Sequence, residues 1–456
     1  MSTFHVQNFG CRAAQADGAA LERQLLEHGL HPADDAGAAE FVILNTCTVT
    51  GAADQDARSA IRRIHRENPE CRILVTGCYA QRAPQELAAL PGVAWVVGNS
   101  HKQDVAGIVA QTQEWRRSPN FIPVATLGRS PDHAIANGPM VLVGDIFAHT
   151  ELLAAPVFEA RTHSERTRPN LKVQDGCDNR CSFCVIPAVR GQSRSLRLAD
   201  AVREVRALVE AGYREVVISG INLGRWGRDL EPPRRFEDLI EAILAETTLE
   251  RLRLSSVEPM DWTERLIDLV AGESRIARHA HVPLQSGSDR VLRRMHRRYR
   301  PWHYAERIHR IRERMPLAAI GADVMVGFPG ETDAEFEENR AFIASLPFTY
   351  LHVFTYSARP GTPAAAMPGQ VRSEVARERN RVLRELAAEK NLAFRRQMVG
   401  RTIPAITLSA QDGDSTEALT DNYLKMRLAG RHEANQWMGV RVVGVTKDGL
   451  EGVCNL

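Results

Sequence analysis

The chain has 456 residues, a length that predicts about three domains. Hydrophobic residues make up 44% and charged residues 25%, as in an ordinary globular protein, and 58 Lys and Arg nearly balance 56 Asp and Glu, so overall charge does not indicate a nucleic-acid binder. No run of about 18 apolar residues and no signal-peptide pattern is present, so we expect a cytoplasmic protein without a membrane span.

The first hundred residues alternate strand and helix patterns. Two short apolar runs, FVILNTC and RILVTGC, each end in a cysteine, and the segment between them, DQDARSAIRRIHREN, has the pattern of a helix. This alternation predicts an α/β domain with a parallel sheet over residues 1–135. Ligands bind beyond the carboxyl ends of such strands, where Cys47 and Cys78 stand, and Cys11, after FHVQNFG, is a third candidate.

From residue 165 to 390 strand and helix patterns alternate six times. The strands are expected at 171–175, 215–220, 251–257, 280–285, 321–328 and 350–356. Thr332 and Glu335 have the spacing of a capping box at the start of one helix. Six βα units are too few for an eight-stranded barrel, so we expect a partial, open (βα)6 barrel with its site at the C-terminal ends of the strands.

The last part of the chain, residues 395–456, changes character. RTIPAITLS, STEALTDNYLKMRLAG and MGVRVVGVTKDGLEGVCNL are short, β-branched and rich in turn residues. This composition predicts a small all-β module, most simply a barrel. Its charges nearly balance, so it has no strongly basic face to attract phosphate.

Three cysteines follow directly after the first strand of the predicted central barrel. Cys177, Cys181 and Cys184 have the spacing C-x3-C-x2-C. Three thiolates can hold three irons of a [4Fe–4S] cluster and leave the fourth iron without a protein ligand, which a catalytic site needs. The competing interpretation is a zinc site completed by a distant histidine.

The stretch CDNRCSFC, with Phe183 before its last cysteine, resembles the signature of the radical S-adenosylmethionine (SAM) superfamily. The resemblance implies a partial (βα)6 barrel and a [4Fe–4S] cluster on Cys177, Cys181 and Cys184. It also implies that the methionine moiety of SAM chelates the open iron and that an electron from the cluster cleaves SAM to a 5′-deoxyadenosyl radical.

Further stretches narrow the resemblance. NTCTVT, GCYAQR, SSVEP, HVPLQSGSDRVLRRMHRRY, GADVMVGFPGET and YSARPGTPA, spread over nearly the whole chain, are similar to the methylthiotransferases. This family implies a second [4Fe–4S] cluster, held here by Cys11, Cys47 and Cys78, although cysteines alone are as often buried structural thiols. It also implies that the C-terminal module is an RNA-binding TRAM domain and that a flavodoxin or ferredoxin type of protein donates the electron.

Contacts to SAM are predicted from the ends of the barrel strands. Gly220 and Asn222, in ISGINLG, are candidates for the methionine end, and Glu258 and Gln285 end the next two strands. Phe183 is a candidate for packing near the adenine. Each of these residues has an equally simple structural role, as the polar cap of a strand or the anchor of a loop.

Basic residues are concentrated in RVLRRMHRRYR, which we expect to form a helix over 290–300. The RNA-binding candidates are Arg293, Arg294, Arg297, Arg298, Tyr423 and Lys425. The arginines would contact phosphates, and Tyr423 would stack on an unpaired base, with a solvated helix face and a core side chain as the alternatives.

Methylthiotransferases act on three substrates: two modified adenosines of tRNA, carrying an isopentenyl or a threonylcarbamoyl group, and an aspartate of a ribosomal protein. GCRAAQ, NTCTVT, GINLG and LTDNYLKM are most similar to the threonylcarbamoyladenosine type. We therefore expect methylthiolation at C2 of N6-threonylcarbamoyladenosine 37 of tRNA by a monomer, with one SAM giving the methyl group and another the radical. The alternative from another class is a zinc-containing RNA-binding protein.

Overall fold

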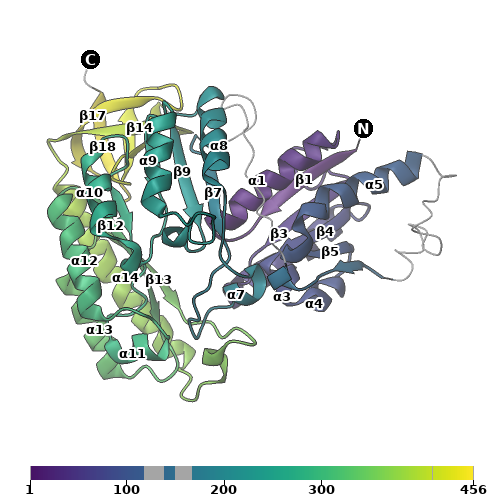
Figure 1. Ribbon diagram of the computed structural model, residues 1–456, viewed down its shortest axis with the longest axis horizontal. Coiled ribbons are helices and arrows are strands. Elements are labelled where there is room, and N and C mark those ends of the chain that lie inside the picture. Colours follow the sequence, from purple (N-terminus) through teal and green to yellow (C-terminus); the bar gives the residue numbers. More distant parts are fainter. Residues whose placement is uncertain (1, 118–137, 149–166, 413, 455–456) are drawn as a thin grey trace.

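The computed structural model describes residues 2–117, 138–148, 167–412 and 414–454. Figure 1 shows three units: a sheet domain at the right, a curved array of strands and helices in the middle and left, and a small β-barrel at the upper left. They follow the chain in this order, and they correspond to the α/β domain, the open barrel and the all-β module expected from the sequence.

The N-terminal domain is built on a parallel sheet of six strands in the order β2-β1-β3-β4-β5-β6. Its strands are β1 (Thr3–Asn8), β2 (His31–Pro32), β3 (Phe41–Thr46), β4 (Arg72–Gly77), β5 (Val93–Gly98) and β6 (Met140–Leu142). Its helices are α1 (Arg12–Glu27), α2 (Gly51–Glu67), α3 (Cys78–Arg82), α4 (Pro84–Ala88) and α5 (Val105–Arg117). Because β3 and β4 lie in the centre, both of their faces are buried, which explains their continuous apolar runs.

The sheet of this domain continues past residue 135. β6 pairs with β5 in parallel, with Trp95 opposite Met140 and Val97 opposite Leu142. Three residues with mixed burial carry too weak a pattern to predict a strand, so the sequence suggested only a linker here.

The central domain holds the six expected parallel strands. They are β7 (Asn170–Asp175), β9 (Glu215–Gly220), β10 (Arg251–Leu254), β11 (His279–His281), β12 (Ala319–Val326) and β13 (Tyr350–Thr355), with β8 (Arg194–Ser195) antiparallel to β7. Its helices are α7 (Ile186–Arg190), α8 (Leu198–Glu210), α9 (Phe236–Glu246), α10 (Glu264–Gly272), α11 (Asp289–Arg294), α12 (Pro301–Arg314), α13 (Asp333–Ser345) and α14 (Ser373–Arg396). One large apolar core lies between the strands and these helices.

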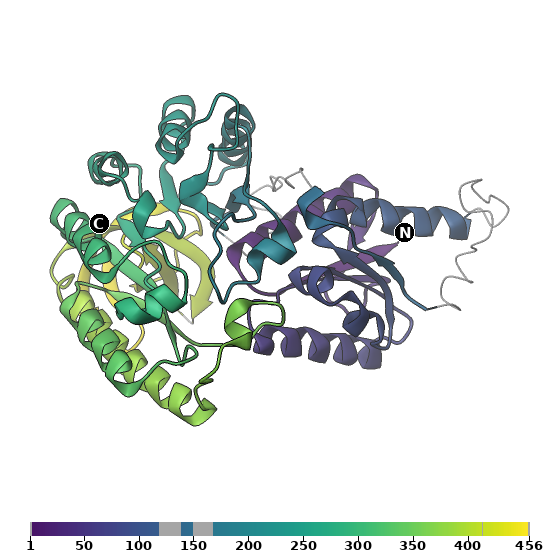
Figure 2. The ribbon, with the colours of Figure 1, turned by 60° about the horizontal axis from the view of Figure 1, so that its bottom comes forward.

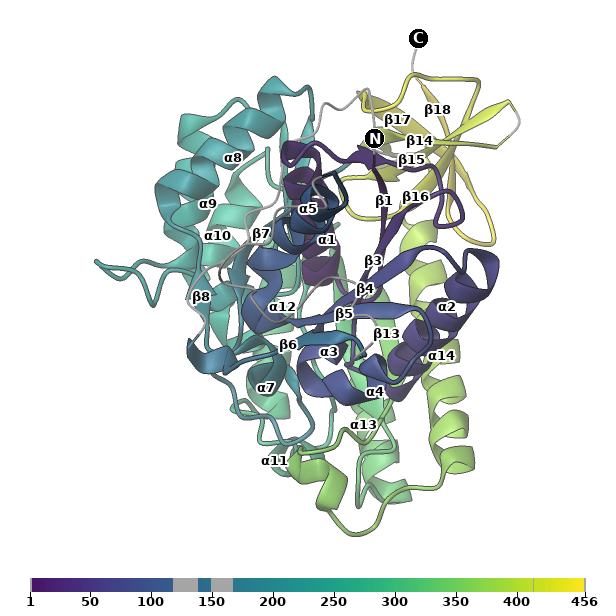
Figure 3. The same ribbon diagram turned by 90° about the vertical axis from the view of Figure 1, so that its right-hand side faces the viewer.

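The strands form an open barrel. β10-β9-β7 and β11-β12-β13 are two parallel ladders, joined where Leu252 of β10 bonds to the backbone of Arg275 and Ala277 just before β11. The capping box expected at Thr332 and Glu335 is present at the start of α13. The N-terminal sheet domain stands on the open side of the barrel, as Figures 1 and 3 show.

The C-terminal module is a closed five-stranded barrel in the order β14-β15-β16-β18-β17. Its strands are β14 (Thr402–Asp412), β15 (Ser415–Thr420), β16 (Lys425–Ala429), β17 (Trp437–Val445) and β18 (Leu450–Cys454). Buried and exposed residues alternate along β16 and β17, so apolar side chains fill the small core and charged side chains lie outside. α14 runs past residue 390 and leads directly into β14.

The basic run from Arg290 to Arg300 is not one helix, contrary to the prediction. α11 ends at Arg294, and His296 follows with φ of 57°, a left-handed conformation that no helix continues. α12 begins only at Pro301, whose ring favours the first turn of a helix. The arginines therefore point in several directions rather than along one face.

The N-terminal domain contacts the barrel in several places. α1 packs beside β7, and the loop after β13, YSARPGTPA, reaches α2, where Arg359 pairs with the buried Asp54 and the Ser357 hydroxyl accepts from the Gly51 amide at 3.0 Å. Figure 2 shows the light-green segment of this loop against the end of α2. In the part of the chain that the structure describes, no helix is both long and apolar enough to cross a membrane.

Candidate active site

A cavity of about 460 Å3 opens at the C-terminal ends of the barrel strands. All three domains line it: Cys11 and Arg12 from the N-terminal domain, Cys177 and its neighbours from the barrel, and Tyr423 from the C-terminal module. The sequence predicted that the site lies at this end of the strands. It did not predict that residues more than 400 positions apart, such as Arg12 and Tyr423, line the same cavity.

The loop that carries Cys177, Cys181 and Cys184 follows β7 and is anchored from the far side of the barrel mouth. The buried Ser182 donates its hydroxyl to the Arg294 carbonyl at 2.7 Å, and its amide donates to the Met295 carbonyl at 3.1 Å. These carbonyls belong to the end of α11, where helical carbonyls lack internal partners. The basic run that the sequence singled out therefore supports the cysteine loop.

Polar groups surround the three sulfurs, and all three cysteines line the cavity. The Asn179 amide donates to Cys177 Sγ at 3.4 Å, and Asn222 Nδ2 lies 3.7 Å from the same sulfur. Arg297 donates to Cys181 Sγ at 3.3 Å. Burial raises the pKa of the Cys184 thiol to about 12, and a bound cation would favour its thiolate form.

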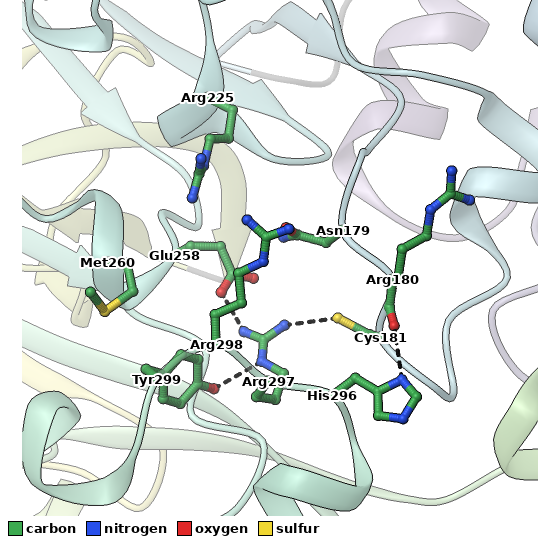
Figure 4. Close-up of a pocket in the computed structure, with 10 residues that line it drawn as sticks. All are labelled: Asn179, Arg180, Cys181, Arg225, Glu258, Met260, His296, Arg297, Arg298 and Tyr299. Carbon is green, nitrogen blue, oxygen red and sulfur yellow. Dashed lines mark hydrogen bonds and ion pairs between the residues drawn. The ribbon is translucent and has the colours of Figure 1, made fainter.

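Arg297 is the most constrained cation at the cavity (Figure 4). Only 8% of it is exposed, and besides Cys181 it contacts the carboxylate of Glu258 and the hydroxyl of Tyr299, the latter at 3.2 Å. Tyr299 in turn donates to the Leu284 carbonyl at 2.6 Å. The sequence suggested Arg297 as a phosphate contact, whereas in the structure its side chain is buried at the barrel mouth and bonded to neighbouring side chains.

The predicted SAM contacts all lie at this cavity, which suits a polar cofactor. Phe183, Gly220, Asn222, Glu258 and Gln285 line its wall. Among the residues that the structure describes, Asn222 Oδ1 and the hydroxyl of Ser219 beside Gly220 are buried without a hydrogen-bond partner. Buried polar atoms are rarely left unpaired, so both are suitable partners for a polar ligand of this cavity.

Phe183 and Gly220 also have structural neighbours. The ring of Phe183 meets that of Phe328 edge-on at 6.4 Å, in a small apolar cluster that anchors the loop. A Cβ on Gly220 would lie 2.8 Å from Gln174 Oε1, which accepts from the Asn222 amide at 2.7 Å. Glycine is therefore required at position 220 by Gln174, rather than by a ligand alone.

Cys11, Cys47 and Cys78 follow β1, β3 and β4, three neighbouring strands of the N-terminal sheet. Gly10, with φ of +97°, packs so closely that a Cβ there would lie 2.7 Å from Cys47 Sγ. Burial, followed by the nearby Cys78, raises the pKa of Cys47 to about 12. Asn99 Nδ2 lies 3.6 Å from Cys78 Sγ, while Asn99 Oδ1 is buried without a partner.

A buried charge cluster, made of Asp17, Lys102, Lys172, Asp175 and Arg190, lies behind these cysteines and joins the two domains. Its two carboxylates pair with three cations at distances up to 2.9 Å, so one positive charge is in excess. Arg190 interacts electrostatically with Cys78 and Cys11. An excess cation of this kind favours anionic sulfur ligands beside it.

Neither set of cysteines forms a site for a single ion. Among the residues that the structure describes, no three His, Cys, Asp or Glu side chains are grouped to hold one metal ion. A cubane of four irons and four sulfides takes each thiolate on a different iron, so its ligands surround the cluster instead of meeting at a point. All eight cysteines are free thiols, with Cys71 and Cys454 away from both sets.

The RNA-binding candidates are not brought together. Arg293 and Arg298 are exposed, Arg294 pairs with Glu335 at 2.7 Å, and Lys425 is exposed at the start of β16. Tyr423 instead lines the cavity. Its backbone has φ of 66°, a conformation that a bulky residue adopts only where its surroundings hold it.

The barrel holds Tyr423 in place through Arg253 of β10. Arg253 is buried, pairs with Glu215 through its Nε at 2.6 Å, and donates to the carbonyls of Thr420 and Asp421 at 3.2 and 3.0 Å. Its guanidinium lies 5.5 Å from the centre of the Tyr423 ring. The turn between β15 and β16 is thereby docked into the barrel mouth, which no local sequence pattern could have indicated.

Two parts of the chain match family models. Residues 3–98 match the family described as Uncharacterized protein family UPF0004, and residues 171–343 match the Radical SAM superfamily. A solved structure of the radical SAM methyltransferase TsrM from Kitasatospora setae has a similar fold, with a TM-score of 0.58 and 16% identity over 80% of this chain and 77% of that chain. The fold and the cysteine loop together define a radical SAM enzyme.

Curated relatives cover nearly all of the chain. Threonylcarbamoyladenosine tRNA methylthiotransferase MtaB of Bacillus subtilis (strain 168) is 35% identical over 95% of this chain and 92% of its own length. A tRNA-2-methylthio-N(6)-dimethylallyladenosine synthase of Sphingopyxis alaskensis is also 35% identical, over 88% and 85%. The chain therefore belongs to the radical SAM methylthiotransferase family, and membership implies SAM and a [4Fe–4S] cluster.

Proposed function

We propose that the protein adds a methylthio group to C2 of N6-threonylcarbamoyladenosine at position 37 of tRNA. The observation that carries the proposal is that one cavity is lined both by Cys11 of the first cysteine set and by Cys177, Cys181 and Cys184 of the second. A reaction that needs a radical and a sulfur at one carbon atom requires both sources to face the same space. Two relatives that match over 95% and 96% of this chain carry this activity in their names.

Cys177, Cys181 and Cys184 hold the [4Fe–4S] cluster that binds SAM in this proposal. The cluster and SAM, when bound, supply the radical chemistry that the unactivated C2–H position requires. Gly220, Asn222, Glu258, Gln285 and Phe183 surround SAM. Arg297 fixes the Glu258 carboxylate, so we assign it to the cofactor side of the site and not to RNA.

Cys11, Cys47 and Cys78 hold a second [4Fe–4S] cluster. Their thiolates carry negative charge that the excess cation of the buried charge cluster offsets. Cys11 is exposed at the cavity while Cys47 and Cys78 are buried behind it, so such a cluster would present one side to the substrate.

The partner is tRNA, which the C-terminal barrel binds as a TRAM-like module. Arg293, Arg298 and Lys425 are exposed and contact phosphates, and Arg294 stays with Glu335. We further propose that the protein is a monomer and that it works in the cytoplasm, where its tRNA substrates are found. A flavodoxin or ferredoxin type of protein supplies the electrons.

The dimethylallyladenosine synthases are the second candidate, because their identity to this chain equals that of the threonylcarbamoyladenosine enzymes. Mass spectrometry of tRNA nucleosides from a strain that lacks this gene separates the two. We expect loss of the methylthio mark on threonylcarbamoyladenosine alone. Loss of the methylthio mark on the isopentenyl nucleoside, or on neither nucleoside, would contradict the proposal. If the ribosomal aspartate lacked its methylthio group instead, the protein would be the enzyme that modifies this aspartate.

The two cysteine sets are expected to separate in function. Cys181→Ala should abolish SAM cleavage, whereas Cys78→Ala should leave SAM cleavage largely intact and stop methylthiolation. Anaerobic reconstitution should give about eight irons per chain in the parent protein and about four in either variant. Normal methylthiolation by Cys78→Ala would refute the second cluster, and one or two zinc ions in place of iron would favour a zinc-containing RNA-binding protein.

A further inference from the structure

The end of the cavity formed by β11, β13 and the β15–β16 turn is lined by ring side chains. Its five rings are His279, His281, Tyr350, His352 and Tyr423. Neighbouring ring centres are 4.6 to 5.9 Å apart, and His279, Tyr350 and Tyr423 are all neighbours of one another. We call this end the ring subsite. A wall of aromatic and imidazole rings stacks on a nucleobase of any sequence.

Arg12 brings a positive charge to the ring subsite. Its guanidinium donates to the Tyr423 hydroxyl at 3.0 Å and acts electrostatically on His279 and His352. The structure pairs it with no carboxylate among the residues described, whereas Arg297, the other guanidinium of the cavity, is neutralised by Glu258. Arg12 is therefore a cation of the cavity wall that is hydrogen-bonded to a neutral group, the Tyr423 hydroxyl.

Two histidines of the ring subsite, His279 and His352, do not supply this charge at neutral pH. Burial, followed by the nearby Arg253, lowers the pKa of His279 well below its ordinary value. Burial, followed by His281, also lowers the pKa of His352. The third histidine, His281, has a carboxylate beside it, because its Nε2 lies 3.4 Å from Asp323 Oδ1. The permanent positive charge at this end of the cavity comes from Arg12.

We propose that the ring subsite binds the N6 substituent of the target adenosine and that Arg12 pairs with the carboxylate of its threonylcarbamoyl group. The proposal rests on the proposed function and deepens it, because it names the residue that selects the substrate. Threonylcarbamoyl is an anionic, hydrogen-bonding group, and a guanidinium can bind a carboxylate through two parallel hydrogen bonds.

The same subsite disfavours an isopentenyl group. That substituent is apolar and uncharged, so on binding it would cover Arg12 and the imidazoles without pairing with them. Leaving buried polar groups unpaired is a strong basis for rejecting a substrate. Identity to relatives does not distinguish the two substrate types here, whereas the chemistry of this wall does.

The simpler interpretation is that Arg12 only ties the N-terminal domain to Tyr423. The test therefore changes the charge of the substrate as well as that of the protein. Three anticodon stem-loop RNAs carry at position 37 threonylcarbamoyladenosine, its carboxylate methyl ester, or unmodified adenosine. Binding to the reconstituted full-length protein is measured by fluorescence anisotropy, without turnover, for the parent, Arg12→Gln, Arg12→Lys and Tyr423→Phe.

We expect the parent to bind the acid about ten to a hundred times more tightly than the ester, the range for a hydrogen bond to a charged group. Arg12→Gln should bind the two RNAs equally, Arg12→Lys should keep part of the preference, and Tyr423→Phe, which removes only the tether, should keep nearly all of it. Arg203→Gln, an exposed arginine of α8 paired with Asp200, is the matched control and should behave as the parent.

Three results would overturn the inference. They are an acid-to-ester preference that survives in Arg12→Gln, equal binding of acid and ester by the parent, and loss of the preference in Tyr423→Phe to the same degree as in Arg12→Gln. Iron content is measured for each variant, because Arg12 is next to the proposed cluster ligand Cys11. If Arg12→Gln contains less iron than the parent, the preference of Arg12→Lys is used to test the inference instead. Failure of the proposed function is distinct, because the parent would then not methylthiolate the threonylcarbamoyladenosine RNA.

Discussion

At the scale of single residues, Glu258 and Arg297 form an ion pair on the cavity wall beside Cys181. A carboxylate on a cavity wall would repel thiolates, and Arg297 lies between Glu258 and Cys181, within hydrogen-bond distance of both. Two consecutive arginines have opposite surroundings, because Arg297 is buried and Arg298 is exposed. Their roles should therefore differ.

Arg297→Gln is expected to weaken SAM binding about tenfold or more, because Glu258 loses a charged hydrogen-bond partner. Arg298→Gln should leave the SAM dissociation constant within about twofold but weaken tRNA binding and lower its salt dependence, as loss of one phosphate contact does. Equilibrium binding of SAM, and of tRNA at several salt concentrations, checks both. The interpretation fails if the two variants affect SAM equally.

At this scale the sequence predicted that six cysteines follow strands. Cys177, Cys181 and Cys184 stood out by their compact spacing, whereas Cys11, Cys47 and Cys78 were singled out by the family resemblance. The role of Arg297 was not predictable, because it stands in a basic run whose members look alike in the sequence. Its burial follows from the left-handed His296, which turns the chain back toward the barrel mouth. Ser182 and Ser219 carry no sequence signal at all.

At the scale of elements, the turn between β15 and β16 is the part of the C-terminal module that enters the site. Arg253 of β10 holds it through two backbone carbonyls and is itself held by Glu215, and both charged side chains are fully buried. Removing one member of a buried ion pair leaves the other without compensation.

Arg253→Met is therefore expected to lower the free energy of unfolding by about 3–5 kcal/mol and to weaken RNA binding by releasing Tyr423. Arg265→Met, an exposed arginine of α10 that pairs with Asp238 and Glu241, is the control and should cost less than about 1 kcal/mol. Thermal and urea unfolding measure both. Equal losses in the two variants would contradict the docking role of Arg253.

At the scale of the whole molecule, the buried charge cluster joins α1 of the N-terminal domain to β7 and α7 of the barrel. Burial opposes the ionisation of Asp17, but Lys102, Lys172 and Arg190 outweigh it and hold the pKa of Asp17 well below its ordinary value. One cysteine set belongs to the N-terminal domain and the other to the barrel, so this junction joins the two domains that carry them.

Asp17→Asn is expected to destabilise the protein by about 3–5 kcal/mol, because three buried cations then share only Asp175. The pKa of Asp17 is lowered in the folded state, so its contribution is complete above the unfolded pKa of about 4. It decreases as the pH falls below that value and is lost on passing the lowered folded pKa. The difference from the parent should thus stay constant between about pH 5 and 8 and shrink only in more acidic solution.

Denaturant unfolding at a series of pH values measures this difference. Asp200→Asn, which removes the carboxylate of an exposed pair on α8, is the control and should change stability little at any pH. A difference that grows as the pH falls would show that Asp17 is not stabilised as an anion.

The sequence by itself determined the succession of two α/β units and a β module, the parallel direction of the strands, the positions of the cysteines at strand ends and the family resemblance. These features depend on local periodicity and on short motifs, which are visible in the sequence before the fold is known. Only the tertiary structure decided that Cys11, Arg12 and Tyr423 share a cavity with Cys177, and that Arg297 contacts Glu258 and Cys181. Such contacts join residues hundreds of positions apart, and they depend on how buried charges and a docked turn fix the domains together.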